Sequence, residues 1–273
     1  MLKFVPTPIG NLEDITFRSL KALEEAEIFL CEDTRVTKKL LKLFKEKLNT
    51  NEFCDEFLSL HSHNENSYLT QEFAQTLKSK NVVYVSDAGM PCISDPGAKL
   101  VDFCIKNEIE YDILPGANAV LTAFAMSGFE TKEFVFFGFL DHKGQNRAQI
   151  LNKAMQNKFV SIIYESPHRI EKLINEICAI DENRVIFVVK ELTKMHQKFY
   201  KLSALELVQK FKSINLNGEW VVVIEPNPKT DQISIEEILE LEITLKEKAK
   251  MVAQLQNISP KEAYNNLLKM DKK

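Results

Sequence analysis

Short apolar runs alternate with amphipathic segments through the first 225 residues, and this alternation constrains the fold more than any other feature of the sequence. Runs such as 82–85 and 185–189 are continuously apolar, which is typical of strands covered by helices on both faces. The segments between the runs repeat apolar residues at helical spacing. The sequence therefore predicts α/β layers. We expect strands at 2–5, 28–31, 57–60, 82–85, 111–114, 134–139, 159–164, 184–189 and 220–224.

Two residue pairs in this part of the chain signal helix starts. Asp95-Pro96 and Ser166-Pro167 each place a capping side chain directly before a proline. Proline is favoured at the first position of a helix because its missing N–H would have no partner there. We therefore expect helices to begin at these two prolines.

The residues from 227 onward change character. Ser234 with Glu237, and Ser259 with Glu262, form two capping boxes that predict helix starts. No strand-like run follows them. We therefore expect three parts: an α/β domain at 1–114, a second α/β domain at 115–226 and a small helical appendage at 227–273.

Glycine and proline concentrate in the loops that follow the first five predicted strands. These loops hold four of the eight glycines and five of the nine prolines. In a parallel sheet the carboxyl ends of the strands share one edge, where ligands bind. Glycine lets the backbone approach a ligand closely, and proline stiffens a loop. We therefore predict one rigid site built from the loops 6–11, 32–35, 61–65, 86–97 and 115–118.

Several classes of protein are disfavoured by what the sequence lacks. It has no G-x-x-x-x-G-K-[ST], G-x-G-x-x-G or G-x-S-x-G pattern, which argues against P-loop, Rossmann and hydrolase sites. The five cysteines include no C-x-x-C pair, and His61-x-His63 has no further ligand cluster, so we expect neither disulfides nor a metal. No apolar run approaches the roughly 18 residues of a membrane span. Pro6 and Gly10 interrupt the first residues before a signal-peptide core forms, so we expect a cytoplasmic protein.

One basic stretch stands out in a chain whose net charge is −4. A local basic surface attracts a polyanion such as nucleic acid even on an acidic protein. Charge alone equally fits a solvated helix face. The stretch contains Arg35, Lys38, Lys39, Lys42, Lys45 and Lys47 against Glu46 alone.

An ordered series of motifs spans nearly the whole chain. It consists of VPTPIGNLEDIT at 5–16, EDTR at 32–35, HSHNE at 61–65, SDAGMPCISDPG at 86–97, LPG at 114–116, SGF at 127–129, YESPHR at 164–169 and KELTK at 190–194. Together these motifs resemble the tetrapyrrole methylase superfamily and, within it, the family that methylates small-subunit ribosomal RNA. The helical end of the chain is similar to the C-terminal extension of that family.

The resemblance implies a fold and a reaction. It implies a first domain with a mainly parallel sheet, a second with a mixed sheet, and S-adenosylmethionine held in the cleft between them in a homodimer. It implies methylation of the ribose 2′-hydroxyl of a cytidine in the decoding centre of 16S rRNA. The implied donor contacts are Pro8, Ile9, Gly10, Asp87, Gly89, Met90, Asn118, Ala119, Tyr164 and Leu192. The implied RNA contacts are Arg35, Lys38, Lys39, Lys42, His168 and Arg169.

The chain departs from the family pattern at a few positions. Val36 stands where the family usually has histidine, so this position is a poor catalytic candidate. Met90 and Cys92 replace the more usual threonine and glycine. Ala117-Asn118 replace proline and serine, which changes the size of the side chain at a donor contact.

We hypothesise that a side chain near the end of the second predicted strand acts as a base and accepts the proton of the ribose 2′-hydroxyl. A sulfonium methyl is already electrophilic, so alignment and exclusion of water are the main requirements, and a nearby base assists. We place this role near Glu32, Asp33 and His61, with Arg35 holding RNA phosphate or orienting a carboxylate. The alternative is a helix N-terminus whose acidic side chains complement the helix dipole.

The aromatic residues and the basic pair at 168–169 have structural alternatives. His168 and Arg169 follow a predicted helix start and could simply face solvent. Phe134, Phe136, Phe137 and Phe139 resemble a base-stacking strip, but aromatics at strand spacing are more often core, and we interpret them as core. Trp220 is interpreted in the same way.

Three functions remain open at this point. The first is the RNA 2′-O-methyltransferase. The second is a methylase of a tetrapyrrole or another small acceptor, because one scaffold hosts several acceptors. The third is a non-catalytic RNA-binding or assembly factor, which the intact series of loops disfavours.

Overall fold

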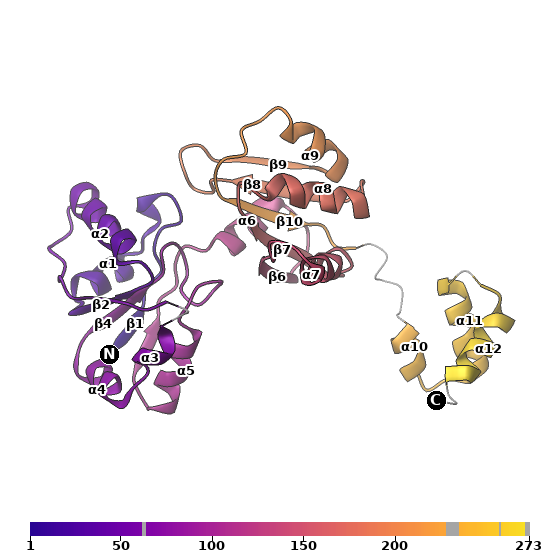
Figure 1. The fold of residues 1–273 in the computed structure, drawn as a ribbon, viewed down its shortest axis with the longest axis horizontal. Coiled ribbons are helices and arrows are strands. Elements are labelled where there is room, and N and C mark those ends of the chain that lie inside the picture. The colour runs from indigo at the N-terminus through magenta and orange to yellow at the C-terminus, as the bar shows by residue number, and fades with distance from the viewer. Residues whose placement is uncertain (62–63, 228–234, 257, 271–273) are drawn as a thin grey trace.

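The computed structural model describes residues 1–61, 64–227, 235–256 and 258–270. Figure 1 shows two sheets with flanking helices, followed by a group of helices at the C-terminal end. The prediction of α/β layers with a helical end is therefore confirmed. The predicted division at 114/115 and 226/227 falls between these groups of elements, and we keep it as our proposal for the domain boundaries.

The first sheet is entirely parallel and has the strand order β3-β2-β4-β1-β5. Its strands are β1 (Leu2–Phe4), β2 (Ile28–Cys31), β3 (Phe57–Ser59), β4 (Val82–Val85) and β5 (Tyr111–Ile113). Every residue of β2 and β4 is buried, as expected for central strands covered on both faces. The helices are α1 (Phe17–Glu24), α2 (Thr34–Leu48), α3 (Glu65–Tyr68), α4 (Gln71–Ser79) and α5 (Ala98–Lys106), with a 3₁₀ turn η1 (Leu12–Asp14).

Side chains from alternate positions of these strands build two cores. Phe4, Leu30 and Tyr84 pack on one face with residues of α4 and α5. Phe29 and Val83 pack on the other face with residues of α1 and α2. This alternation leaves the carboxyl ends of the strands, and the loops that follow them, on one edge of the sheet.

The second sheet is mixed and has the strand order β6-β7-β10-β8-β9. Only β6 and β7 are parallel, and the other neighbours are antiparallel. Its strands are β6 (Phe134–Phe139), β7 (Val160–Glu165), β8 (Val185–Lys190), β9 (Lys198–Ser203) and β10 (Trp220–Ile224). Helices α7 (Gln145–Met155), α8 (Ile170–Ile180) and α9 (Ala204–Phe211) contribute to the core on one face, and α6 (Ala119–Ser127) to the core on the other.

All nine predicted strands are present, with ends that differ by one residue at most. The prediction missed β9. This edge strand pairs only with β8 and carries Lys198 and Lys201 among exposed positions, so it lacks the continuous apolar run of a buried strand. Trp220 is 2% exposed, which confirms its interpretation as core.

The two predicted helix starts at proline are wrong. Helix α5 begins at Ala98 with Gly97 as N-cap, and α8 begins at Ile170 with Arg169 as N-cap. Gly97 has φ 121°, a conformation that favours glycine, so the chain turns into α5 there. The side chains of Asp95 and Ser166 line a cavity instead of capping a helix.

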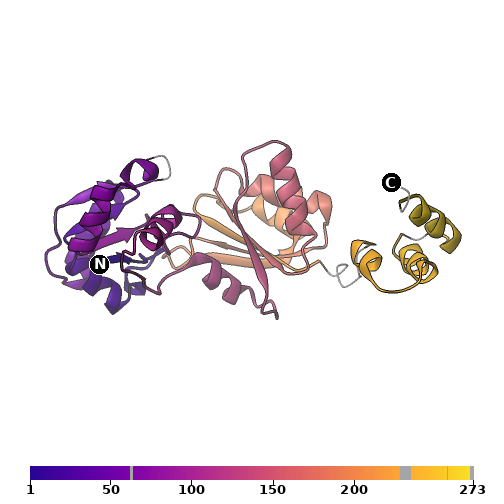
Figure 2. The ribbon, with the colours of Figure 1, turned by 90° about the horizontal axis from the view of Figure 1, so that it is seen from below.

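The C-terminal helices α10 (Ile235–Glu240), α11 (Leu245–Gln256) and α12 (Pro260–Met270) lie together in one group (Figure 2). They have a core of their own. The Glu262 N–H donates to Ser259 Oγ at 3.2 Å, so the second predicted capping position is confirmed. The first, Ser234 with Glu237, lies outside the described residues. The buried side chains are Ile238, Ala249, Val252, Ala253, Ala263 and Leu267. Among the described residues, every helix is too short or too polar to cross a lipid bilayer.

Candidate active site

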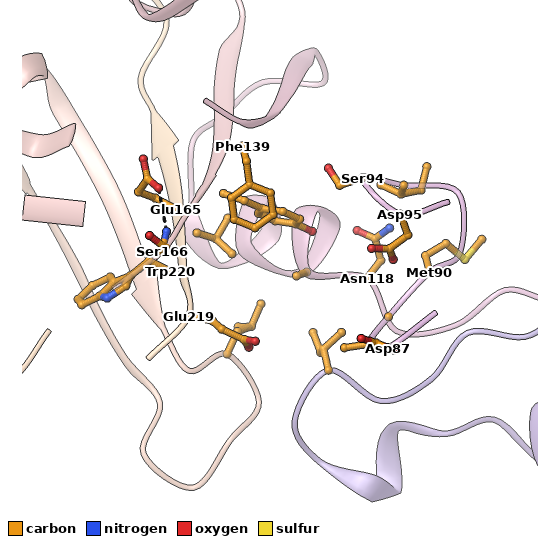
Figure 3. Close-up of a pocket in the computed structure, with 18 of the residues that line it drawn as sticks. Asp87, Met90, Ser94, Asp95, Asn118, Phe139, Glu165, Ser166, Glu219 and Trp220 are labelled. Carbon is orange, nitrogen blue, oxygen red and sulfur yellow. Dashed lines mark hydrogen bonds between the residues drawn. The ribbon is translucent and has the colours of Figure 1, made fainter. Parts of the chain in front are cut away.

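A cavity of about 410 Å³ is lined by loops of the first sheet and by the adjacent end of the second sheet (Figure 3). Eight of the ten predicted donor contacts line it: Ile9, Asp87, Gly89, Met90, Asn118, Ala119, Tyr164 and Leu192. Of the predicted catalytic residues, Glu32 lines it. The structure thus places four of the five predicted loops around one space. The described residues of the fifth loop, 61–65, are absent from its lining.

Loops 6–11, 86–97 and 115–118 are joined by close backbone contacts. Thr7 and Gly89 form an antiparallel bridge, in which each N–H donates to the other carbonyl at 3.0 Å. Gly89 has φ 85°, which favours glycine. A Cβ at Gly116 would lie 2.6 Å from Pro6 Cβ, so only glycine fits there without a shift. The loops after β1, β4 and β5 therefore form one rigid wall.

Gly10 provides the closest contact between this wall and the second sheet. A Cβ at Gly10 would lie 2.5 Å from Lys194 Cγ, 2.6 Å from Thr193 Oγ1 and 2.8 Å from the Leu192 carbonyl. The N–H of Asn11 donates to Thr193 Oγ1 at 3.2 Å. Pro8 and Gly10 are the two predicted donor contacts that are absent from the described lining of the cavity, and Gly10 instead joins its two halves.

Phe139 enters the cavity because β6 is irregular at its end. The register between β6 and β7 shifts between Phe136 and Phe139, and Gly138 has φ 67°. Bulges of this kind re-aim the side chain that follows them. Phe139 is 55% exposed and lines the cavity, so its interpretation as core is wrong. The other three phenylalanines of β6 are half-buried beside the cores of the second sheet.

Three carboxylates from the loops of the first sheet face the cavity. Glu32, Asp87 and Asp95 form no ion pair within the described part of the chain, and no described Lys, Arg or His lines the cavity. Burial, followed by the charge of Glu32, raises the pKa of Asp95 to about 7. Burial also raises the pKa of Glu32 and of Asp87. A cavity with this charge distribution favours a cationic ligand.

Asp33 holds the first turn of α2. Its carboxylate accepts the Arg35 N–H at 2.8 Å, and the Arg35 guanidinium donates to it through Nε at 3.0 Å and Nη2 at 2.6 Å. These hydrogen bonds lower the pKa of Asp33 to about 2. The Asp33 N–H donates to Asp87 Oδ1 at 3.2 Å. This geometry fits the helix N-terminus alternative, because such a carboxylate is a weak proton acceptor near neutral pH.

His61 lies close enough for its charge to lower the pKa of Glu32, while burial raises it. The N–H of His61 donates to Asn64 Oδ1 at 2.8 Å. His63 lies outside the described residues. Asp33, Arg35 and His61 are not among the described residues that line the cavity.

A buried ion-pair network supports the opposite wall. Glu165, at the end of β7, is 1% exposed. It accepts from Arg169 at 2.8 Å and approaches Arg147 at 3.4 Å. Arg169 also donates to the Leu140 carbonyl at 2.9 Å. The guanidinium of Arg169, predicted as an RNA contact, is therefore engaged within the second domain.

The other predicted RNA contacts lie at the surface. Lys38, Lys39 and Lys42 are exposed on α2, with Lys38 4.7 Å from the centroid of the Phe57 ring. His168 is exposed beside the network. Arg147 and the direction of Phe139 are not predicted from the sequence, because they depend on a contact between helix and strand and on a bulge. Asp95 lies in the predicted site loop 86–97, but its side chain is interpreted there as a helix cap.

Metal ligation has no structural support within the described ranges. They contain no group of three or more His, Cys, Asp or Glu side chains placed to hold a metal ion. The five cysteines are free thiols.

A sequence profile described as Tetrapyrrole (Corrin/Porphyrin) Methylases matches residues 1–208. The chain belongs to the tetrapyrrole methylase family. The resemblance seen in the motifs is therefore confirmed.

Curated relatives within the family are similar along the whole chain. Ribosomal RNA small subunit methyltransferase I of Campylobacter fetus is 46% identical over 270 residues, covering 98% of this chain and 100% of the relative. The protein of the same name from Helicobacter pylori strain J99 is 40% identical over 287 residues, covering 100% and 99%. At these identities the chain shares a family with them, and it is a methyltransferase.

Solved structures in the tetrapyrrole methylase fold are similar at low identity. Cobalt precorrin-4 methyltransferase superposes with a TM-score of 0.58 at 17% identity, covering 82% of this chain and 93% of that one. Diphthine synthase gives 0.59 at 14% identity, covering 82% and 89%. These neighbours confirm the fold.

Gly10→Ala is expected to weaken binding of the methyl donor about 100-fold, because the added Cβ separates the two walls of the cavity. Calorimetric titration with S-adenosylmethionine measures this. Gly144→Ala is the matched control, since Gly144 has φ 98° but meets open space. Equal donor affinities in the two variants would show that the Gly10 contact is not needed.

Asp95→Asn is expected to stabilise the ligand-free protein at pH 8. The pKa of Asp95 is about 7 in the folded state, against about 3.9 when unfolded. The folded state therefore binds more protons between these values, and the free energy of unfolding falls as pH rises through this window. Urea unfolding at pH 5, 6.5 and 8 should show an advantage of the variant that grows with pH. Asp102→Asn, on the surface of α5, controls for the loss of a charge. If the free energy of unfolding varied with pH in the same way for both variants, the raised pKa of Asp95 would be contradicted.

Proposed function

We propose that this chain transfers a methyl group from S-adenosylmethionine to the ribose 2′-hydroxyl of a cytidine in the decoding centre of 16S rRNA. The single observation that carries the proposal is the cavity between the two sheets, which is acidic and lacks cationic side chains among its described lining. Family membership supplies methyl transfer, and relatives that are 40% to 46% identical carry the name ribosomal RNA small subunit methyltransferase I.

The residues of the cavity fit this donor. S-adenosylmethionine carries a sulfonium and an ammonium group, and it supplies an electrophilic methyl when bound. Glu32, Asp87 and Asp95 provide negative charge in a lining whose described residues include no Lys, Arg or His. Ile9 and Leu192 provide apolar surface for the uncharged parts of the ligand.

The proposed donor site uses residues from both sheets. Gly89 exposes backbone to the cavity at the bridge with Thr7. Asn118 is the N-cap of α6, where its side chain accepts the Leu121 N–H at 3.0 Å, so the cap is rigid. Tyr164 lies on the other side, in edge contact with Phe139 at a centroid separation of 5.4 Å. These contacts align the ligand and exclude water.

The basic surface of α2 is the proposed docking site for RNA. Lys39 and Lys42 are exposed there, and α2 begins beside the cavity through Asp33 and Asp87. Phosphates that bind along α2 are therefore close to the donor site. We retain Lys38 and His168 as proposed contacts and assign Arg35 and Arg169 to the support of Asp33 and Glu165.

The uncompensated carboxylates disfavour a tetrapyrrole as acceptor. A tetrapyrrole carries several carboxylates, which would meet the like charges of Glu32, Asp87 and Asp95. A ribose hydroxyl brings no charge into the cavity, and its phosphates remain on the basic surface outside.

We extend the proposal to a cytoplasmic homodimer acting on the small ribosomal subunit. Helix α6 is apolar on nearly all sides, burying Val120 and Ala123 while Leu121 is 54% exposed. A helix with apolar residues on both faces supports burial against a second copy. The cytoplasm follows from the location of the proposed substrate.

Labelled methyl transfer to small subunits that lack the modification tests the proposal. Transfer to the subunit or its RNA, located at a cytidine 2′-oxygen, is expected. Bare 16S rRNA and a uroporphyrinogen-type tetrapyrrole serve as alternative acceptors. Transfer to the tetrapyrrole alone would contradict the proposed substrate.

Lys39→Gln is expected to weaken RNA binding and to reduce the slope of log affinity against log salt by about 1, because one phosphate contact is lost. Filter binding of 16S rRNA across a salt series measures both. Lys106→Gln on α5 is the control, since Lys106 is exposed but pairs with Asp102. The same salt slope in both variants would remove α2 from the RNA-binding surface.

A further inference from the structure

Asp95 lies where the first sheet's loops meet the second sheet. It belongs to loop 86–97, which follows β4, and it projects toward the cavity on the wall that also carries Asp87 (Figure 3). A Cβ at Gly138 would lie 3.2 Å from Ser94 Oγ, so the neighbour of Asp95 touches the bulge of β6. Asp95 is thus bordered by both halves of the site.

The backbone around Asp95 is held in an unfavourable conformation. Cys92 has φ 69° and Ser94 has φ 64°, in the left-handed region that residues with a Cβ avoid. Packing fixes this conformation, because a Cβ at Gly97 would lie 2.9 Å from both Cys92 Sγ and the Tyr84 ring. Strain of this kind persists where the surrounding structure determines the position of a functional group.

The charged and titratable groups that face Asp95 all disfavour its ionised form. Glu32 lies at the end of β2 and Asp87 at the end of β4, and both raise the pKa of Asp95 after burial, to about 7. A hydrogen bond with Ser86 opposes them. The remaining titratable neighbours are the buried phenol of Tyr84 on β4, the thiol of Cys92 in the same loop and the phenol of Tyr164 on β7.

The other carboxylates near the cavity are less suited to accept a proton. Asp33 is held by Arg35, and Asp87 accepts the Asp33 N–H. The charge of Glu32 is offset by His61. A cation in the cavity would favour the ionised form of the nearby carboxyls, and Asp95 responds most at neutral pH because its pKa is raised to about 7.

We propose that Asp95 accepts the proton of the hydroxyl that is methylated, and that entry of the cationic donor is what ionises it for this role. The inference rests on the proposed function. In the step, the hydroxyl oxygen bonds to the methyl carbon, and the carbon–sulfur bond breaks with its electron pair left on sulfur. The hydroxyl proton passes to a carboxylate oxygen of Asp95.

The first claim, that binding of the donor ionises Asp95, is tested by measuring proton release when the donor binds in the absence of RNA. Calorimetry at pH 7 in two buffers of different ionisation enthalpy should show that the protein releases about half a proton with S-adenosylmethionine. S-adenosylhomocysteine, whose sulfur is uncharged, should release much less. Asp95→Asn should bind the donor without this release. Equal release by the variant, or by the protein with both ligands, would overturn the proposal.

The second claim, that Asp95 accepts the hydroxyl proton, is tested by single-turnover methylation of unmodified small-subunit RNA. Asp95→Asn should lower the rate of methyl transfer by about 10²–10⁴-fold, because general base catalysis is lost. For the same reason, the rate of this variant should increase less with pH. Asp95→Glu should recover part of the rate and retain the increase of the rate with pH. The RNA concentration at half-maximal rate should stay unchanged, and Asp102→Asn should match the natural protein.

The outcomes separate the two claims. A rate for Asp95→Asn within threefold of the natural protein, with the same pH profile, would overturn the role of Asp95 and leave the substrate intact. Absence of transfer to this RNA by the natural protein would instead contradict the proposed substrate.

Discussion

The close contact of loop backbones at glycine positions is the constraint on which the site depends. Gly116 lets the loop after β5 rest on Pro6, and Gly10 lets the loop after β1 meet Leu192 from the second sheet. Each contact is too short for any other residue. Two sheets with independent cores are thereby brought close enough for their strand ends to line one cavity.

The sequence predicts the parts of the fold that rest on local patterns. Continuous apolar runs locate the buried strands, and the positions of glycine and proline locate the converging loops. It does not predict β9, whose exposed lysines hide an edge strand, or Phe139, whose direction depends on a bulge. Asp95 lies in loop 86–97, which the sequence assigns to the site, but an aspartate before proline has the local pattern of a helix cap, and only the tertiary structure shows that its side chain faces the cavity.

The two walls of the cavity differ in whether their carboxylates are paired with arginines. On the second sheet, Glu165 is neutralised by Arg147 and Arg169, so this wall is a fixed scaffold. On the first sheet, Glu32, Asp87 and Asp95 form no ion pair with a described Lys or Arg, so a charged ligand in the cavity shifts their protonation. The cavity therefore combines a wall whose charges are paired with a wall whose protonation responds to ligand charge.

The hydrogen bond from the Asp33 N–H to Asp87 has a mechanical consequence. It attaches the first turn of α2 to the cavity wall, while the lysines of the same helix face outward. The position of the first turn of α2 and that of the Asp87 carboxylate are therefore linked. The basic outer surface of α2 and the acidic cavity are connected through the main-chain amide of Asp33.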